Sequence, residues 1–277
     1  MASPKPNAPP DLPPLFPPIA ALRAGVVIAT FVIVTVLAMP WQMLLLRVAP
    51  AAARRFPYAY HRLVARLFGV RIRVVGRPVT DQGVLLLANH TSWMDIVVFS
   101  AVTPLSFVAK AEIARWPFFG TLARLQRTVF VARERRAQTG AVAGEIGARL
   151  AAGECLVLFP EGTSHDGNSV LPFKSALLGA AEARHADGRH VTVQPVSAAY
   201  VGCQGMPMGR ELRPFFAWFG DMEMVSHLWE ALKTGPLDVT MEFHAPATLD
   251  TMNRKELAAQ ARELVQNGVS RALAGRV

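Results

Sequence analysis

Cysteine is scarce in this chain of 277 residues. Only Cys155 and Cys203 occur, and their spacing matches no metal-ligand pattern. Two cysteines cannot supply the disulfide framework of a small secreted protein or a zinc site built from cysteine pairs. We therefore predict a reducing compartment, two thiols that belong to the core, and no metal site.

Two well-known signatures are also missing. The chain has no G-x-S-x-G serine elbow and no glycine-rich loop of the dinucleotide or Walker type. The first absence argues against the serine nucleophile of the α/β-hydrolases. The second argues against a nucleotide cofactor held in such a loop, and we predict no cofactor.

Acidic residues are too few to balance the basic ones. The chain has 29 lysines and arginines against 20 aspartates and glutamates, a formal net charge of +9. Such a chain favours an anionic partner, which can be nucleic acid, anionic lipid or a phosphorylated substrate. The hydrophobic content of 52% favours membrane lipid. Because no recognised nucleic-acid module is present, we predict no nucleic-acid partner.

The N-terminal region divides into two segments. Residues 1–20 hold eight of the 21 prolines, all within the first 18 positions, and are predicted to be a disordered tail. Residues 21–47 form a hydrophobic helix whose run from 24 to 46 carries no formal charge. As a helix this run covers roughly 30 to 35 Å, about the thickness of a hydrocarbon core. Pro40 leaves open whether the helix spans the membrane or re-enters it, and a buried core helix is the alternative.

Residues 48–68 are predicted to be a basic interfacial segment. Arginines alternate there with aromatic residues and leucines, a composition typical of a segment lying on anionic lipid. More basic residues follow the hydrophobic run than precede it. The positive-inside rule therefore predicts the cytoplasmic (inner) membrane, with the large C-terminal domain facing the cytoplasm.

Residues 69–277 alternate short apolar runs with helical patterns, which predicts one α/β domain. We expect a mixed, mostly parallel sheet flanked by helices, with the membrane helix at its N-terminus. The predicted strands are 70–75, 83–88, 105–109, 128–132, 154–159, 191–200 and 238–244. The predicted helices are 92–102, 115–125, 137–152, 173–185, 222–233 and 253–273.

Three polar clusters follow predicted strands, where chemistry collects in open α/β sheets: "NHTSWMD", "FPEGTSHDG" and the region of Arg133. In the first, "NHTSWMD", the carboxylate of Asp95 can reach one imidazole nitrogen of His90 and leave the other nitrogen free as a base. A capped helix with a satisfied histidine is the alternative. In the second, "FPEGTSHDG", the turn after Phe159 presents backbone N–H groups and a carboxylate to a polar ligand.

With these residues in view, the sequence resembles the glycerolipid acyltransferase family, typified by 1-acylglycerol-3-phosphate O-acyltransferase. The family's N-H-x-x-x-x-D signature matches Asn89, His90 and Asp95, and its F-P-E-G-T signature matches residues 159–163. Three further blocks, "KAEIARWPFFG", "TVFVAR" and "VQPVS", resemble family blocks in the right order. The similarity covers roughly residues 70 to 200.

The resemblance implies a membrane-bound O-acyltransferase of membrane lipid biosynthesis. His90, oriented by Asp95, would deprotonate the hydroxyl of a lysolipid, which then attacks the thioester of acyl-CoA or acyl-carrier protein. The acceptor would be 1-acyl-sn-glycerol-3-phosphate. The implied catalytic residues are His90 and Asp95, and the implied substrate-binding residues are Glu161, Gly162, Thr163, Arg133 and Lys110.

One position departs from the family pattern. Ser164 stands where the family has an arginine thought to contact the phosphate of the acceptor. Residues 161–177 look like those of a bacterial subgroup that acylates lyso-ornithine lipid, which makes this lipid a competing acceptor. His165 and Asp166, which follow, are interpreted as a solvated turn. A lipid hydrolase or thioesterase, and a non-catalytic lipid-binding protein, are the weaker alternatives.

Overall fold

The protein is described by a computed structural model that covers residues 17–131, 136–185 and 187–277. Most of the predicted proline-rich tail, residues 1–16, lies outside the described residues.

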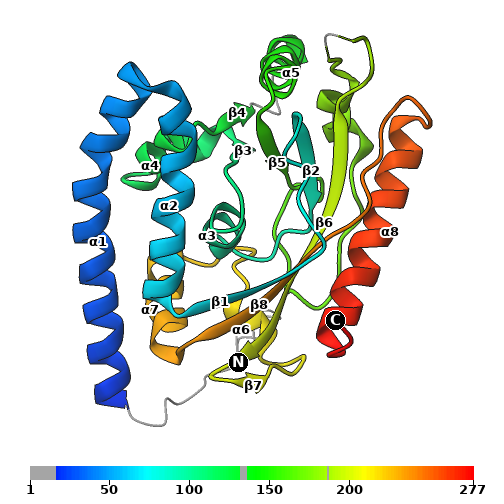
Figure 1. Cartoon of the computed structure of the whole chain (residues 1–277). Coiled ribbons are helices and arrows are strands. Elements are labelled where there is room, and N and C mark those ends of the chain that lie inside the picture. The colour runs from blue at the N-terminus through cyan, green and yellow to red at the C-terminus, as the bar shows by residue number, and fades with distance from the viewer. Residues whose placement is uncertain (1–16, 132–135, 186) are drawn as a thin grey trace.

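The strands form one sheet in the order β1-β8-β6-β2-β5-β3-β4, with β7 paired to β6 (Figure 1). All neighbouring strands are parallel except β8 and β7, which each run antiparallel to β6. The strands are β1 (Val70–Val75), β2 (Val84–Ala88), β3 (Ser106–Lys110), β4 (Val129–Val131), β5 (Cys155–Leu158), β6 (Thr192–Cys203), β7 (Met206–Pro207) and β8 (Leu237–Phe243). The predicted mixed, mostly parallel sheet is confirmed.

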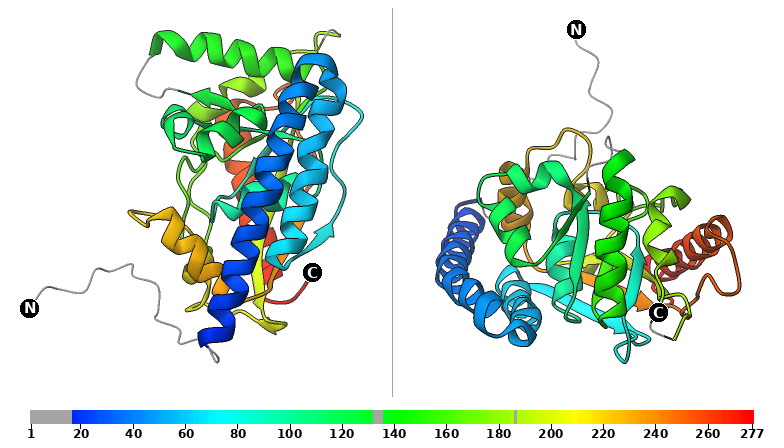
Figure 2. Two further views of the ribbon diagram at one scale, coloured as in Figure 1. Left: turned by 90° about the vertical axis from the view of Figure 1, so that its left-hand side faces the viewer. Right: turned by 90° about the horizontal axis from the view of Figure 1, so that it is seen from above.

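Helices cover both faces of the sheet (Figures 1 and 2). The α-helices are α1 (Pro17–Val48), α2 (Pro50–Phe68), α3 (Met94–Ser100), α4 (Phe119–Leu125), α5 (Arg136–Ala151), α6 (Arg213–Phe216), α7 (Met224–Thr234) and α8 (Arg254–Leu273). Two 3₁₀ helices are η1 (Ala111–Arg115) and η2 (Ser175–Glu182). One apolar core lies between the sheet and α2, α3 and α7, and the other between the sheet and α5, η2 and α8.

The central strand β2 explains how the first polar cluster is placed. All five of its residues are buried, because neighbouring strands flank it and helices cover both of its faces. A parallel strand buried in this way reads as a continuous apolar run rather than an alternating one. Since β2 and β5 are parallel neighbours, the residues that follow Ala88 and Leu158 emerge at the same edge of the sheet.

Two predicted helices differ from the structure. Residues 115–125 divide between η1 and α4, because Pro117 disfavours helical backbone at the residue before it and Phe118 adopts φ +62°. Residues 173–185 form the 3₁₀ helix η2 instead of an α-helix. In a 3₁₀ helix residues three apart lie on one side, and here Leu178 and Ala181 are both fully buried. The short elements α6 and β7 were not predicted.

Helices α1 and α2 form an antiparallel hairpin on one side of the domain (Figures 1 and 2). Three contacts along the length of α1 hold it against α2 and α4. The rings of Phe31 and Phe68 lie 5.3 Å apart, Thr35 Oγ1 lies 2.6 Å from Tyr60 Oη, and Gln42 donates to the carbonyls of Ala53 and Leu125. Helix α1 continues without interruption past Pro40, so it does not fold back on itself.

The outer side of α1 is strongly apolar. Its segment Pro18–Val48 is long enough to cross a membrane, and the most apolar 18-residue window in it has a mean hydropathy of 2.3, yet only 11% of that window is buried. The large apolar side chains exposed on it are Ile19, Leu22, Val26, Val32, Ile33, Val36, Leu37, Trp41, Met43, Leu44 and Val48. These side chains extend along the whole helix and leave an uncovered hydrophobic surface.

Gly83, which precedes β2, tests the packing of this strand. A Cβ atom there would meet the carbonyl oxygen of Leu150 at 1.7 Å, whereas a Cβ at Gly144 in α5 would meet nothing within 4 Å. We expect Gly83→Ala to lower the free energy of unfolding by about 1 to 3 kcal/mol. Gly144→Ala should raise it by up to about 1 kcal/mol, because alanine favours a helix interior. Denaturant titration of both variants measures the difference, and equal effects would contradict the packing.

Candidate active site

Asn89 fixes the exit of β2 against its neighbour β6. Its side-chain Nδ2 donates to the carbonyl of Ala198 at 2.8 Å, and the Ala198 N–H donates to Asn89 Oδ1 at 2.9 Å. The amide thus replaces the ladder hydrogen bonds that the two strands would otherwise continue. The chain leaves the sheet at a defined point, and the next residue is His90.

Asp95, in the first turn of α3, is fully buried and accepts four hydrogen bonds. His90 Nδ1 donates to Oδ2 at 2.8 Å, and the Thr91 and Ser92 N–H groups donate to the same oxygen at 2.8 and 3.0 Å. Tyr200 Oη donates to Oδ1 at 2.7 Å. Burial and the charge of Asp95 raise the pKa of Tyr200, so the phenol keeps the proton that it donates. The carboxylate therefore holds His90 with its Nδ1 protonated and its Nε2 available as a base.

Glu161 joins the second motif to the first. It is 2% exposed, its Oε2 accepts the N–H of His90 at 3.0 Å, and its Oε1 accepts the N–H of Leu171 at 2.9 Å. Burial, opposed by these two hydrogen bonds, raises the pKa of Glu161 to about 8. Both oxygens bind backbone groups inside the protein. In this arrangement Glu161 positions the backbone of His90, and its contact with a substrate stays a prediction.

The ring of His90 lies between the polar turn and an apolar cavity. It stacks on Phe159 with centroids 4.2 Å apart and planes inclined by 14°. The His90 side chain is 20% exposed and lines a cavity of about 250 Å³. The free imidazole nitrogen is therefore accessible, whereas Asp95 is not.

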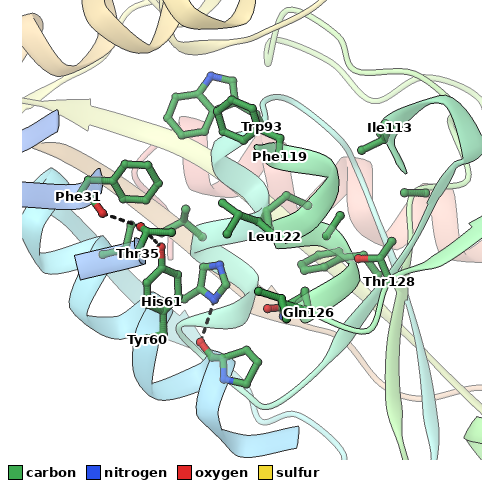
Figure 3. A pocket seen from close by; sticks show the side chains of 18 of the residues that line it. Phe31, Thr35, Tyr60, His61, Trp93, Ile113, Phe119, Leu122, Gln126 and Thr128 are labelled. Carbon is green, nitrogen blue, oxygen red and sulfur yellow. Dashed lines mark hydrogen bonds between the residues drawn. The ribbon is translucent and has the colours of Figure 1, made fainter. Parts of the chain in front are cut away.

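Residues from α1, α2, α3, β3, η1, α4 and α7 enclose this cavity (Figure 3). Most of the wall is apolar, with Phe31, Trp93 and Leu122 as examples. Two of the polar side chains in it have internal partners: Thr35 binds Tyr60, and His61 binds the carbonyl of Pro57. Burial lowers the pKa of His61 to about 4, so this ring is neutral at pH 7. The cavity can hold a long uncharged chain with one end at His90.

The other predicted substrate-binding residues do not all lie beside His90. Gly162 closes the turn after β5 at φ +75°, and its N–H donates to the carbonyl of Phe159 at 3.0 Å. Thr163 is exposed beside it, and Lys110 is exposed at the end of β3. Arg133 lies outside the described residues. The geometry places Gly162 and Thr163 at the sheet edge that carries His90.

Sequence reasoning missed three parts of the site. Tyr200 lies 105 positions from its partner Asp95 in the sequence, and the amide bridge of Asn89 depends on which strand neighbours β2. The cavity wall from α1, α2 and α4 has no local pattern besides hydrophobicity. The buried tyrosine at the end of an apolar strand was the one available signal, because buried Tyr hydroxyls need a partner.

Comparison with known proteins agrees with this geometry. The sequence model of the family described as Acyltransferase matches residues 71–199. The lyso-ornithine lipid O-acyltransferase of Brucella abortus is 48% identical over 262 residues, which cover 93% of this chain and 98% of that protein. The chain belongs to the acyltransferase family.

Further similarities extend the assignment. The lyso-ornithine lipid O-acyltransferase of Rhizobium meliloti is 43% identical over 248 residues, 88% of this chain and 85% of that protein. The crystal structure of the 1-acyl-sn-glycerophosphate acyltransferase PlsC from Thermotoga maritima matches with a TM-score of 0.63 at 22% identity, covering 91% of this chain and 97% of that one. The similarity to this crystal structure shows the fold of the chain. The predicted enzyme class, an acyltransferase of the 1-acylglycerol-3-phosphate O-acyltransferase type, is confirmed.

The raised pKa of Glu161 predicts a pH-dependent stability. The folded carboxyl titrates at about 8 and an exposed one at 4.5, so the folded state binds more protons between these values. The free energy of unfolding therefore falls as pH rises through this range. Because Glu161→Gln removes the titrating group, the melting temperature of the wild type should fall more steeply between pH 5 and 8 than that of the variant. Thermal melting followed by circular dichroism measures both slopes, and equal slopes would contradict the assignment.

Proposed function

We propose that this acyltransferase transfers an acyl chain from a thioester donor to the free hydroxyl of lyso-ornithine lipid. The observation that carries the proposal is the position of His90, held by the buried Asp95 at the wall of an apolar cavity. A base beside an apolar cavity brings a hydroxyl and an acyl chain together. The donor is acyl-CoA or acyl-carrier protein.

The proposed reaction is a direct transfer. His90 Nε2 takes the proton of the acceptor hydroxyl while that oxygen attacks the thioester carbonyl, and Asp95 stabilises the imidazolium that forms. The carbon–sulfur bond then breaks, and the proton passes to the leaving thiolate. General-base catalysis of this kind supplies about 10² to 10⁴ in rate. Positioning of the two substrates supplies a further part.

The acceptor is inferred from two observations. Ser164 replaces the arginine that would bind a phosphate bidentately, and its hydroxyl carries no charge. Two relatives that align over most of this chain carry the name lyso-ornithine lipid O-acyltransferase. Both observations favour an amino-acid headgroup over the phosphomonoester of 1-acyl-sn-glycerol-3-phosphate.

The protein is membrane-associated, and the packing of α1 supports a particular orientation. Helix α1 contacts the domain from Ala24 to Gln42 and exposes its apolar side chains along the opposite side. If α1 stood across the bilayer, the charged residues Arg54 and Arg55 of α2 would enter the hydrocarbon, at a high cost in free energy. We therefore propose that α1 lies along the cytoplasmic face of the inner membrane, with the domain in the cytoplasm.

A competition assay tests the function. Wild-type protein receives one acyl donor with equal amounts of lyso-ornithine lipid and 1-acyl-sn-glycerol-3-phosphate, and acylated ornithine lipid should form faster. His90→Ala should lower the rate by at least about 10², because the general base is removed, and vesicle flotation should show unchanged membrane binding. Activity of His90→Ala near the wild-type level, or free fatty acid formed without any acceptor, would refute the mechanism.

The cavity predicts a chain-length effect. Leu122→Trp places an indole inside the cavity, so kcat/KM should fall about tenfold for a sixteen-carbon donor and less for an eight-carbon donor, because only the longer chain needs the filled space. Leu37→Trp adds the same ring on the exposed side of α1 and is the matched control. A similar loss for both chain lengths would place the acyl chain elsewhere.

A further inference from the structure

Two loops that touch the backbone of the catalytic turn carry opposite charges. The His165 N–H donates to the carbonyl of His90 at 3.0 Å, and the Trp218 N–H donates to the carbonyl of Thr91 at 2.9 Å. The first bond ties the loop 164–168 to the turn. The second ties the segment that begins with α6. Both loops therefore lie beside the turn that carries His90.

Arg213, the first residue of α6, is a partly buried cation with neutral partners. Its Nη1 donates to Asn168 Oδ1 at 2.6 Å, its Nη2 donates to the carbonyl of Met208 at 3.1 Å, and its buried Nε has no hydrogen-bond partner. Within the described parts of the chain it forms no ion pair. Burial and the nearby Arg210 lower its pKa. The charge of Asp166 opposes this shift without forming an ion pair, so a further anion that reaches the guanidinium would stabilise it.

Asp166 supplies the opposite charge on the neighbouring loop. Its Oδ1 accepts the N–H of Asn168 at 2.9 Å and its Oδ2 accepts Asn168 Nδ2 at 3.1 Å, and the side chain is 28% exposed. His165 Nδ1 also lies 2.9 Å from Oδ1. A carboxylate has about four lone-pair positions, so these contacts still leave room on Oδ2 for an ammonium group. The turn predicted at His165 and Asp166 is consistent with the hydrogen bond from the Asn168 N–H to the Asp166 side chain. That interpretation gave no role to the charge of Asp166.

Asn168 keeps the two charges apart. Its amide nitrogen binds Asp166 and its amide oxygen binds Arg213, so the carboxylate and the guanidinium share a neutral neighbour without pairing directly. Opposite charges fixed on either side of an amide match a ligand that itself carries both charges. A phosphomonoester, in contrast, would meet the repulsion of Asp166, and Ser164 offers it no positive charge.

We propose that Arg213 and Asp166, spaced by Asn168, bind the carboxylate and the ammonium of a zwitterionic amino-acid headgroup, and so select the acceptor. This proposal rests on the proposed lysolipid acyltransferase activity. An ornithine headgroup linked through one amino group keeps a carboxylate and a second, charged amine. The chemistry of the site is therefore that of a free amino-acid-like zwitterion.

The test compares steady-state kinetics of Arg213→Gln and Asp166→Asn with lyso-ornithine lipid and with 1-acyl-sn-glycerol-3-phosphate. Each variant should raise KM for lyso-ornithine lipid about tenfold or more, with little change in kcat, because a charged hydrogen bond to the headgroup is lost. Asp166→Asn should also raise kcat/KM for the phosphate acceptor. Arg189→Gln and Asp187→Asn, at a distant exposed turn, are the matched controls.

Modified acceptors assign each charge separately. Acetylation of the free amine of lyso-ornithine lipid should raise KM about tenfold in the wild type but not in Asp166→Asn. Methyl esterification of its carboxylate should raise KM about tenfold in the wild type but not in Arg213→Gln. If the wild type acylates lyso-ornithine lipid but neither variant changes the ratio of kcat/KM between the two acceptors, the headgroup site is refuted while the enzyme function stands. Absence of transfer by the wild type to either acceptor would refute the function itself.

Discussion

The buried carboxylate of Asp95 is the interaction on which the site depends. An ionised group removed from water is very costly unless hydrogen bonds replace its hydration. Four donors do so here: the His90 ring, two successive N–H groups of the turn, and the Tyr200 hydroxyl. Satisfying this one group determines the shape of the turn, the orientation of the His90 ring and the position of β6 beside β2.

A second buried carboxyl group, that of Glu161, extends this arrangement to the neighbouring strand β5. Glu161 receives the N–H of His90 and that of Leu171, so the turn after β5 and the turn after β2 cannot move independently. The base is therefore held from both sides by backbone contacts, while its ring stays open to the cavity. The same turn continues into the loop that carries Asp166, which places the proposed headgroup site next to the chemistry.

Much of the fold could be predicted because its signals are local. The inner strands are apolar runs bounded by turn residues, and all seven predicted strands are present within a few residues of their expected ends. Failures occurred where the backbone deviates for tertiary reasons, as at Phe118 with its positive φ and in η2, whose 3₁₀ geometry turns Leu178 and Ala181 to the core together. The short helix α6 gives too little periodicity to be detected.

The sequence by itself determined the α/β class, the contact between His90 and Asp95, and the apolar character of residues 21–47, because each depends on neighbours within one turn or one hydrophobic run. Only the tertiary structure decided that Tyr200 binds the carboxylate of Asp95 and that Glu161 binds the backbone of His90. It also decided that Arg213 lies on the loop next to Asp166, where the sequence has no arginine at position 164. These contacts join residues tens of positions apart, and strand order and loop packing bring them together.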